Sequence, residues 1–131
     1  MESFTVATRE HTQFLSIDQE VQRIVTASGV RNGVCHVFVP HTTAGMTINE
    51  NADPAVVQDI RNILERLVPW KGNYAHTEGN SAAHVKASLM GFSQTVLVED
   101  GRLALGTWQS LYFCEFDGPR SRRVWVQVIP S

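Results

Sequence analysis

TVLVEDGRLALGTWQSLYFCEFDGPRSRRVWVQVI, residues 95–129, is the stretch that decides the fold of this chain. Asp-Gly at positions 100–101 is a strong signal for a two-residue hairpin, and Asp-Gly-Pro at 117–119 is a second turn. Between and around these turns lie apolar runs rich in β-branched and aromatic residues, as strands require. We expect strands over residues 95–98, 103–105, 108–116 and 122–129. Strands joined by tight turns pair antiparallel, so this stretch predicts an antiparallel sheet.

The first half of the chain adds more strands to this sheet pattern. We expect strands over residues 4–8, 13–17, 34–39 and 42–50, the first two paired across residues 9–11. The 34–39 run is apolar apart from His36, which is typical of a strand buried on both faces. We therefore expect His36 to be a core or interface histidine.

Helices are expected at three places. The first begins at Ser16, with Gln19 at capping-box spacing, and ends before Gly29. The clearest begins at Asp53-Pro54, a cap followed by a proline preorganised for the first turn. Its apolar residues recur at helical spacing through Leu67 and predict a helix that covers the core. A short third helix is expected over residues 81–89, with Val85 and Leu89 on an apolar face. Strands in both halves and only two or three helices predict an α+β fold, in one domain over residues 1–131.

Composition excludes several classes of protein. The net charge is −2, so a general nucleic-acid binder, which would carry a basic stripe, is not expected. No apolar run approaches the ~20 residues of a membrane span, and the N-terminus has no signal-peptide pattern, which favours a cytoplasmic protein without membrane contact. Cys35 and Cys114 lie in apolar runs and are expected to be buried and reduced.

Two histidine-bearing segments carry most of the expected chemistry. They are His41-Thr42-Thr43-Ala44-Gly45 and the stretch from His76 to His84, and they hold three of the five histidines. Neutral imidazoles at positions 41, 76 and 84 could form a three-histidine metal site with one open position. The spacing matches no short zinc motif, so it does not establish a metal site. Glu78 is a candidate fourth ligand or general base, although a loop glutamate is more often solvated.

Other residues of these segments are candidates for binding phosphate. The first free N–H groups of the third helix, near Asn80 and Ser81, would attract an anion, although either residue could equally be only a helix cap. Thr42 and Thr43 could bind phosphate oxygens or only support a turn. The run from Arg120 to Arg123 could bind an anion or be a solvated strand end.

The sequence leaves the roles of two further residues open. Glu115 lies in an apolar strand and must be paired, exposed or functional, with Arg120 or Arg122 as its partner. Trp108 is either a core aromatic or a stacking wall for a flat ligand.

Three strings resemble a known family: HTTAGMTINENAD (41–53), YAHTEGNSAAHVKASLMG (74–91) and GTWQSLYFCEFDGPRSRRV (106–124). They are similar in order and spacing to the YjbQ-like proteins, and the resemblance extends over about residues 4–128. It implies an α+β protein with a β-sandwich core that assembles as a homotrimer. It also implies a metal pocket, near a subunit boundary, that uses His41, His76 and His84. Gly45 stands where alanine is found in the family, and we expect this difference to leave the site undisturbed.

The resemblance also implies a class of activity. Some members are described as thiamine-phosphate synthases, which join a pyrimidine pyrophosphate to a thiazole phosphate and release pyrophosphate. We therefore expect a small-molecule enzyme acting on a phosphorylated substrate, with a divalent metal, zinc or magnesium. The assigned roles are catalysis for His41, His84 and Glu115, phosphate binding for Thr42, Thr43, Asn80, Ser81 and Arg120, and metal binding for His41, His76 and His84. The alternatives are a non-catalytic trimer that binds metal or a phosphometabolite, and a metal-assisted hydrolase.

Overall fold

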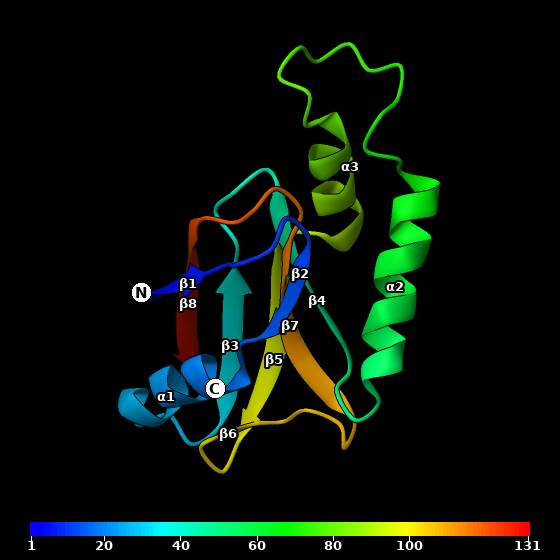
Figure 1. Ribbon diagram of the computed structural model, residues 1–131. Helices are drawn as coiled ribbons and strands as arrows, with labels where there is room; N and C mark the ends of the chain where they lie inside the picture. The colour runs from blue at the N-terminus through cyan, green and yellow to red at the C-terminus, as the bar shows by residue number, and fades with distance from the viewer.

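The computed structural model describes all of residues 1–131 and contains eight strands and three helices (Figure 1). The strands are β1 (Glu2–Ala7), β2 (Gln13–Ser16), β3 (Gly33–Phe38), β4 (Ala44–Glu50), β5 (Ser93–Glu99), β6 (Arg102–Leu103), β7 (Gln109–Glu115) and β8 (Ser121–Pro130). The helices are α1 (Asp18–Ser28), α2 (Pro54–Leu67) and α3 (Ser81–Met90).

The strands form two antiparallel sheets, which confirms the predicted α+β fold with a β-sandwich core. The larger sheet has the order β1-β8-β3-β5-β6, and the smaller has the order β2-β7-β4. Asp100 and Gly101 both have positive φ, as the predicted two-residue hairpin between β5 and β6 requires. β6 stops at Leu103, so the strand predicted over residues 103–105 is only partly formed.

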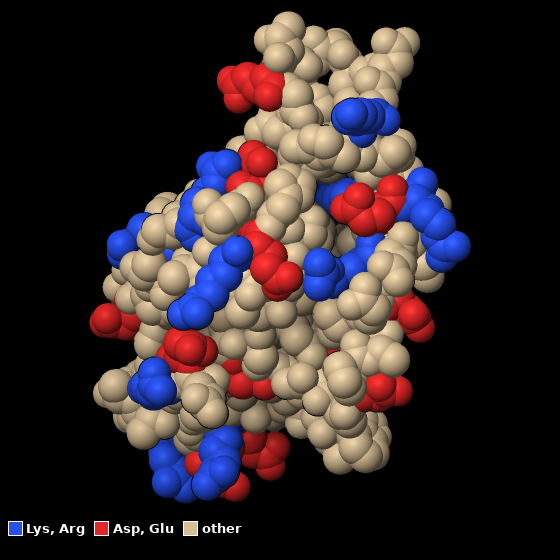
Figure 2. All heavy atoms as spheres, viewed as in Figure 1, with Lys and Arg blue, Asp and Glu red and all other residues tan.

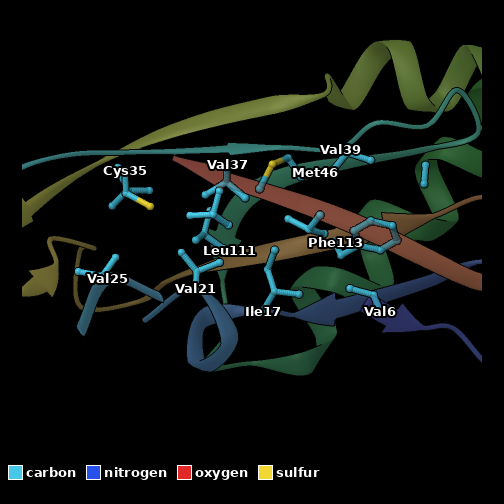
Figure 3. Packing of buried hydrophobic residues seen from close by; sticks show 14 of the residues in the cluster. Val6, Ile17, Val21, Val25, Cys35, Val37, Val39, Met46, Leu111 and Phe113 are labelled. Carbon is cyan, nitrogen blue, oxygen red and sulfur yellow. The ribbon is translucent and has the colours of Figure 1, made fainter. Parts of the chain in front are cut away.

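The main core lies between the two sheets and is closed by α1 (Figure 3). Val37 and Cys35 of β3 face Met46 of β4 and Phe113 of β7 across this core, and Val21 of α1 is fully buried in it. Both cysteines are buried and unpaired, as predicted, and burial raises the pKa of the Cys35 thiol to about 11 and that of Cys114 as well.

Several local predictions for the first half of the chain are wrong. β1 pairs with β8 and β2 with β7, in different sheets, so the predicted pairing of the first two strands does not occur. β3 alternates between buried and exposed residues, because no layer covers its outer face. His36 is therefore not a core residue but lies exposed on that face, where its Nδ1 is 2.9 Å from Oγ1 of Thr95, and its alternative place at an interface stays a prediction. Ser16 does not cap α1, because its hydroxyl bonds to Ser110 instead.

Helices α2 and α3 form a second layer on the outer face of the smaller sheet. Ala83 and Ala87 of α3 pack against Tyr112 and Cys114 of β7, and Leu64 of α2 joins this cluster. The predicted cap of α2 is confirmed, since the side chain of Asp53 accepts a hydrogen bond from the Ala55 N–H.

The predicted apolar faces of the two helices are only partly buried. Ile63 and Leu67 of α2 are 46% and 70% exposed, and Val85 and Leu89 of α3 are exposed too. The small alanines of α3, rather than its large apolar residues, face the sheet because they allow close approach. Trp108 is also exposed, so the first of its two alternatives, a core aromatic, is wrong. No helix is both long and apolar enough to cross a membrane.

Candidate functional site

One end of the sandwich brings together the segments that the sequence singled out. The β3–β4 connection, which carries His41 and Thr43, lies beside the β7–β8 turn, and α3 begins close to that turn (Figure 1). Two contacts fix this arrangement: the Phe116 N–H donates to the Thr43 carbonyl, and Asn80 donates to Asp117. Residues from three distant parts of the chain therefore share one end of the molecule.

A buried ion pair stabilises this end of the sandwich. Arg122 donates from Nε to Oε1 of Glu115 and from Nη2 to Oε2, and Nη2 also reaches the hydroxyl of Thr43. Thr8 and the N–H of Asp117 donate to the same carboxylate. Burial alone would raise the pKa of Glu115, but these hydrogen bonds lower it below its ordinary value. Glu115 is fully buried with both oxygens engaged, so it holds the β7–β8 turn and leaves no surface for a substrate.

Asp117 connects the turn to the start of α3. Its Oδ2 accepts hydrogen bonds from Nδ2 of Asn80 at 3.0 Å and from Nη2 of Arg120 at 3.1 Å. Its Oδ1 lies 3.9 Å from Nε2 of His11. Asn80 precedes α3 without capping it through its side chain, and its own Oδ1 is buried without a partner. The N–H groups at the start of α3 therefore have no side-chain acceptor from this position.

His41 is held by a backbone hydrogen bond. Its Nε2 accepts from the N–H of Arg123 at 2.8 Å, so the neutral ring carries its proton on Nδ1. Desolvation, followed by the positive charge of Arg122, lowers the pKa of His41 below its ordinary value. His41 is thus a neutral hydrogen-bond donor in this arrangement, and binding a metal through Nε2 would break the bond to Arg123.

His76 and His84 form a pair beside the start of α3. Their ring centroids are 5.3 Å apart and the rings are nearly perpendicular. Glu78 follows in the same loop, with its Oε2 3.7 Å from Nε2 of His76. His84 is half-buried on the helix, whereas His76 and Glu78 are exposed. The helix therefore fixes one ring, and the loop brings the second ring to it.

The donor chemistry of this pair fits a divalent ion such as zinc. Two imidazoles bound to one tetrahedral zinc have ring centroids about 5 Å apart, because each Zn–N bond is about 2.0–2.1 Å. The separation of His76 and His84 agrees with this value. No group of three or more His, Cys, Asp or Glu side chains in the chain is arranged to hold a metal. His41 thus does not join the pair within one chain.

The predicted phosphate-binding residues divide into two groups. The hydroxyl of Thr43 accepts a hydrogen bond from Arg122, and the side-chain amide of Asn80 donates one to Asp117. Thr42 is exposed, Ser81 is half-buried at the first position of α3, and Arg120 is about half exposed beside Asp117. Thr43 is buried, whereas half-buried Asn80 and the second group offer surface to a ligand.

The structure also contains polar contacts that the sequence did not indicate. Lys86 of α3 is buried and pairs with Glu65 of α2. A lysine among alanines on a short helix gives no signal of burial, because the side chain is usually solvated. His11 was likewise unassigned, and its ring lies against Trp70 with a centroid separation of 4.4 Å.

Comparison with known proteins gives consistent matches over the whole chain. A family model described as "UPF0047 protein YjbQ-like" matches residues 2–131. The UPF0047 protein YugU of Bacillus subtilis is 44% identical over 130 residues, covering 98% of each protein. The UPF0047 protein of Methanocaldococcus jannaschii is 47% identical over 126 residues, covering 96% of this chain and 91% of its own length. A crystal structure of a YjbQ/UPF0047 protein from Clostridium acetobutylicum is 53% identical, with a TM-score of 0.96, covering 98% of this chain and 100% of that one.

Proposed function

The chain belongs to the UPF0047 family of YjbQ-like proteins, and we propose that it is an enzyme acting on a phosphorylated small molecule at the end of the sandwich where α3 begins. The observation that carries this proposal is the pair of His76 and His84 next to a helix start that has no side-chain cap. Imidazoles for a divalent metal and free N–H groups for an anion then lie side by side.

Each residue at this end has a role in the proposal. His76 and His84 would hold a divalent metal, which neutralises phosphate charge when bound. Ser81 and the first N–H groups of α3 bind phosphate oxygens, and Arg120 adds a positive charge. Asp117 orients Arg120, and Glu115 fixes the strand ends through Arg122. His41 donates from Nδ1 to an oxygen of the substrate.

A homotrimer is part of this proposal, with the outer face of the larger sheet as its contact surface. That face carries Phe38 and Trp125 stacked with centroids 5.7 Å apart, and further along it lie exposed Leu97 and Ile129 on either side of Val34. Exposed apolar clusters of this kind are typical of protein interfaces. His41 lies at the end of β3 beside this face, bound to the backbone of β8, so a second copy docked there would approach it.

The activity to be tested first is thiamine-phosphate synthesis, in which a pyrimidine pyrophosphate and a thiazole phosphate are joined and pyrophosphate leaves. The assay uses both precursors with added zinc or magnesium. We expect product from the wild-type protein and from Ser88→Ala, an exposed position one turn beyond His84, and loss of product in His84→Ala. Undetectable turnover in all three proteins would remove the synthase assignment.

A second function is the binding of metal or a phosphometabolite without catalysis. It is favoured by the burial of Glu115, because this carboxylate offers no surface to a substrate and so is not available as a catalytic group. With that carboxylate engaged, the exposed glutamate in contact with the histidine pair is Glu78. In this case phosphate compounds would raise the melting temperature without forming product. A screen of phosphate and acyl esters in the same experiment identifies a metal-assisted hydrolase instead.

A further inference from the structure

The loop between α2 and α3 forms one side of an open cavity, and His76 and Ser81 are the only predicted site residues in its wall. The cavity measures about 350 Å³, and its walls include Trp70, Lys71 and Tyr74. This volume is within the range of small-molecule pockets, about 300–1,000 Å³. The loop projects from the body of the molecule and is mostly uncharged in Figure 2, since Lys71 and Glu78 are its only charged residues.

We propose that this cavity selects phosphorylated substrates that carry a flat ring, with the ring beside Trp70 and Tyr74 and the phosphate at Ser81. This inference rests on the proposed function, because it assigns the ring of the same substrate to a separate part of the site. His76 and Ser81 line the cavity and also belong to the metal and phosphate region, so the two parts are continuous.

The aromatic wall at Tyr74 is fixed before any ligand binds. Its ring lies so close to Gly72 that a Cβ there would come within 2.7 Å of a ring carbon. The hydroxyl of Tyr74 donates to the carbonyl of Pro69. A ring held in this way loses little conformational entropy when a ligand stacks on it.

Trp70 is fixed by different contacts. It is half-buried, packs against the cluster that contains Leu64, and meets His11 edge to face. An indole in such a position is held by the protein core on one side and contributes to the cavity on the other. Aromatic side chains attract flat rings through stacking in addition to the burial of area.

Two polar side chains in the wall of the cavity suit a phosphate ester. Ser81 is the first residue of α3, and Lys71 adds a positive charge to the wall. An aromatic wall with a cationic and hydroxyl-bearing end matches a phosphate monoester of an aromatic or heteroaromatic ring. A puckered aliphatic ester of equal size would keep the phosphate contacts and lose the stacking.

The test compares phenyl phosphate, cyclohexyl phosphate, inorganic phosphate and phenol as probes, with dissociation constants from titration calorimetry. We expect the wild-type protein to bind phenyl phosphate roughly 5-fold more tightly than cyclohexyl phosphate. Trp70→Ala and Tyr74→Leu should each weaken phenyl phosphate about 10-fold and leave inorganic phosphate unchanged. Trp108→Ala, an exposed tryptophan outside the cavity, should change neither value.

The outcomes separate this inference from the proposed function. Equal binding of the two esters by the wild-type protein, or a preference that survives both substitutions, overturns the ring cavity and leaves the proposed function standing. Failure of phosphate and both esters to bind contradicts the proposed function. In that event the selection of phosphorylated substrates is overturned as well, and phenol binding that Tyr74→Leu removes would show only a site for an aromatic ring. Tyr74 lies in an exposed loop, so its variant stays interpretable if Trp70→Ala fails to fold.

Discussion

At the scale of single residues, the pair of Glu115 and Arg122 determines how the strand ends are arranged. Both side chains are buried, and Arg122 also binds Thr43 of the β3–β4 connection. Removing one partner of a buried pair leaves the other charge without compensation. The pair therefore stabilises the geometry of the site although it has no contact with solvent.

The first prediction concerns Glu115→Gln. We expect this variant to lose about 3 kcal/mol of unfolding free energy, because the guanidinium of Arg122 would stay buried without its counter-charge. Urea unfolding followed by circular dichroism measures the loss. A double variant, Glu115→Gln with Arg122→Met, should recover part of it, and a single variant as stable as the wild type would contradict this role.

The same carboxylate makes stability depend on pH. Its pKa is lower in the folded protein than the ordinary value of 4.5, so the unfolded chain binds the proton more readily. The stabilisation is present above about pH 4.5 and is lost as the pH falls through the lowered value. The difference between wild type and Glu115→Gln should therefore shrink below pH 4.5.

At the residue scale, the sequence predicted a contact correctly where a buried charge requires a partner. A carboxylate in the apolar run of β7 had to be paired, and one of the two arginines named for it is the partner. The burial of Lys86 could not be predicted, because it depends on Glu65 in another helix. The exposure of Trp108 likewise depends on where β7 begins, since Trp108 lies in the turn just before the buried part of this strand.

At the scale of elements, close packing of α3 on β4 positions the histidine pair. A Cβ at Gly45 of β4 would lie 2.6 Å from the carbonyl oxygen of Gly91, just after α3. Met46 also donates its N–H to this carbonyl. Glycine at position 45 therefore allows a close approach of β4 and α3 that a methyl group would obstruct.

We predict that Gly45→Ala destabilises the protein by about 1–3 kcal/mol, because α3 or β4 must move to admit the methyl group. Thermal unfolding of this variant tests the prediction. Gly106→Ala is the matched control, since there the nearest atoms belong to the flexible side chain of Gln109. Equal melting temperatures for the two variants would show that α3 and β4 are not tightly fixed.

The contact between α2 and α3 gives another prediction. Glu65→Ala leaves the buried ammonium of Lys86 without its partner and should cost about 2 kcal/mol. Lys86→Met removes the buried charge and should change stability by less than about 1 kcal/mol. Chemical unfolding measures the free energy of unfolding of both variants. An equal loss of this free energy in the two would contradict the pairing of Lys86 with Glu65.

Element boundaries were predictable where local chemistry dominates. Asp53-Pro54, Gly29 and Asp100-Gly101 begin, end and reverse their elements as expected. Pairing was less predictable, because β1 and β2 are adjacent in the chain but belong to different sheets. Which half of an amphipathic helix is buried also depends on its neighbours, and α2 leaves Leu67 exposed.

At the scale of the whole molecule, the proposed trimer accounts for the apolar outer face of the larger sheet. Trp125→Glu places a charge at the centre of the Phe38–Trp125 stack and should break the contact between copies. Light scattering should give the wild type three times the 14.6 kDa mass of one chain and this variant a single chain mass. Trp108→Glu is the control, and a wild type that is monomeric would contradict the trimer.

The candidate site was predictable in part at this scale. The sequence indicated which segments carry chemistry, and the fold brings His76 to His84 and Asn80 to Asp117. It could not show that His41 bonds to the backbone of Arg123, since that contact depends on the position of β8.

The most direct measurement is a zinc titration by calorimetry on the wild type, His76→Ala, His84→Ala and Ser88→Ala. We predict one zinc ion per chain for the wild type and Ser88→Ala. The zinc affinity should be at least about 100-fold weaker in each histidine variant. Zinc binding of equal affinity in all four proteins, or none in the wild type, would contradict a metal held by His76 and His84.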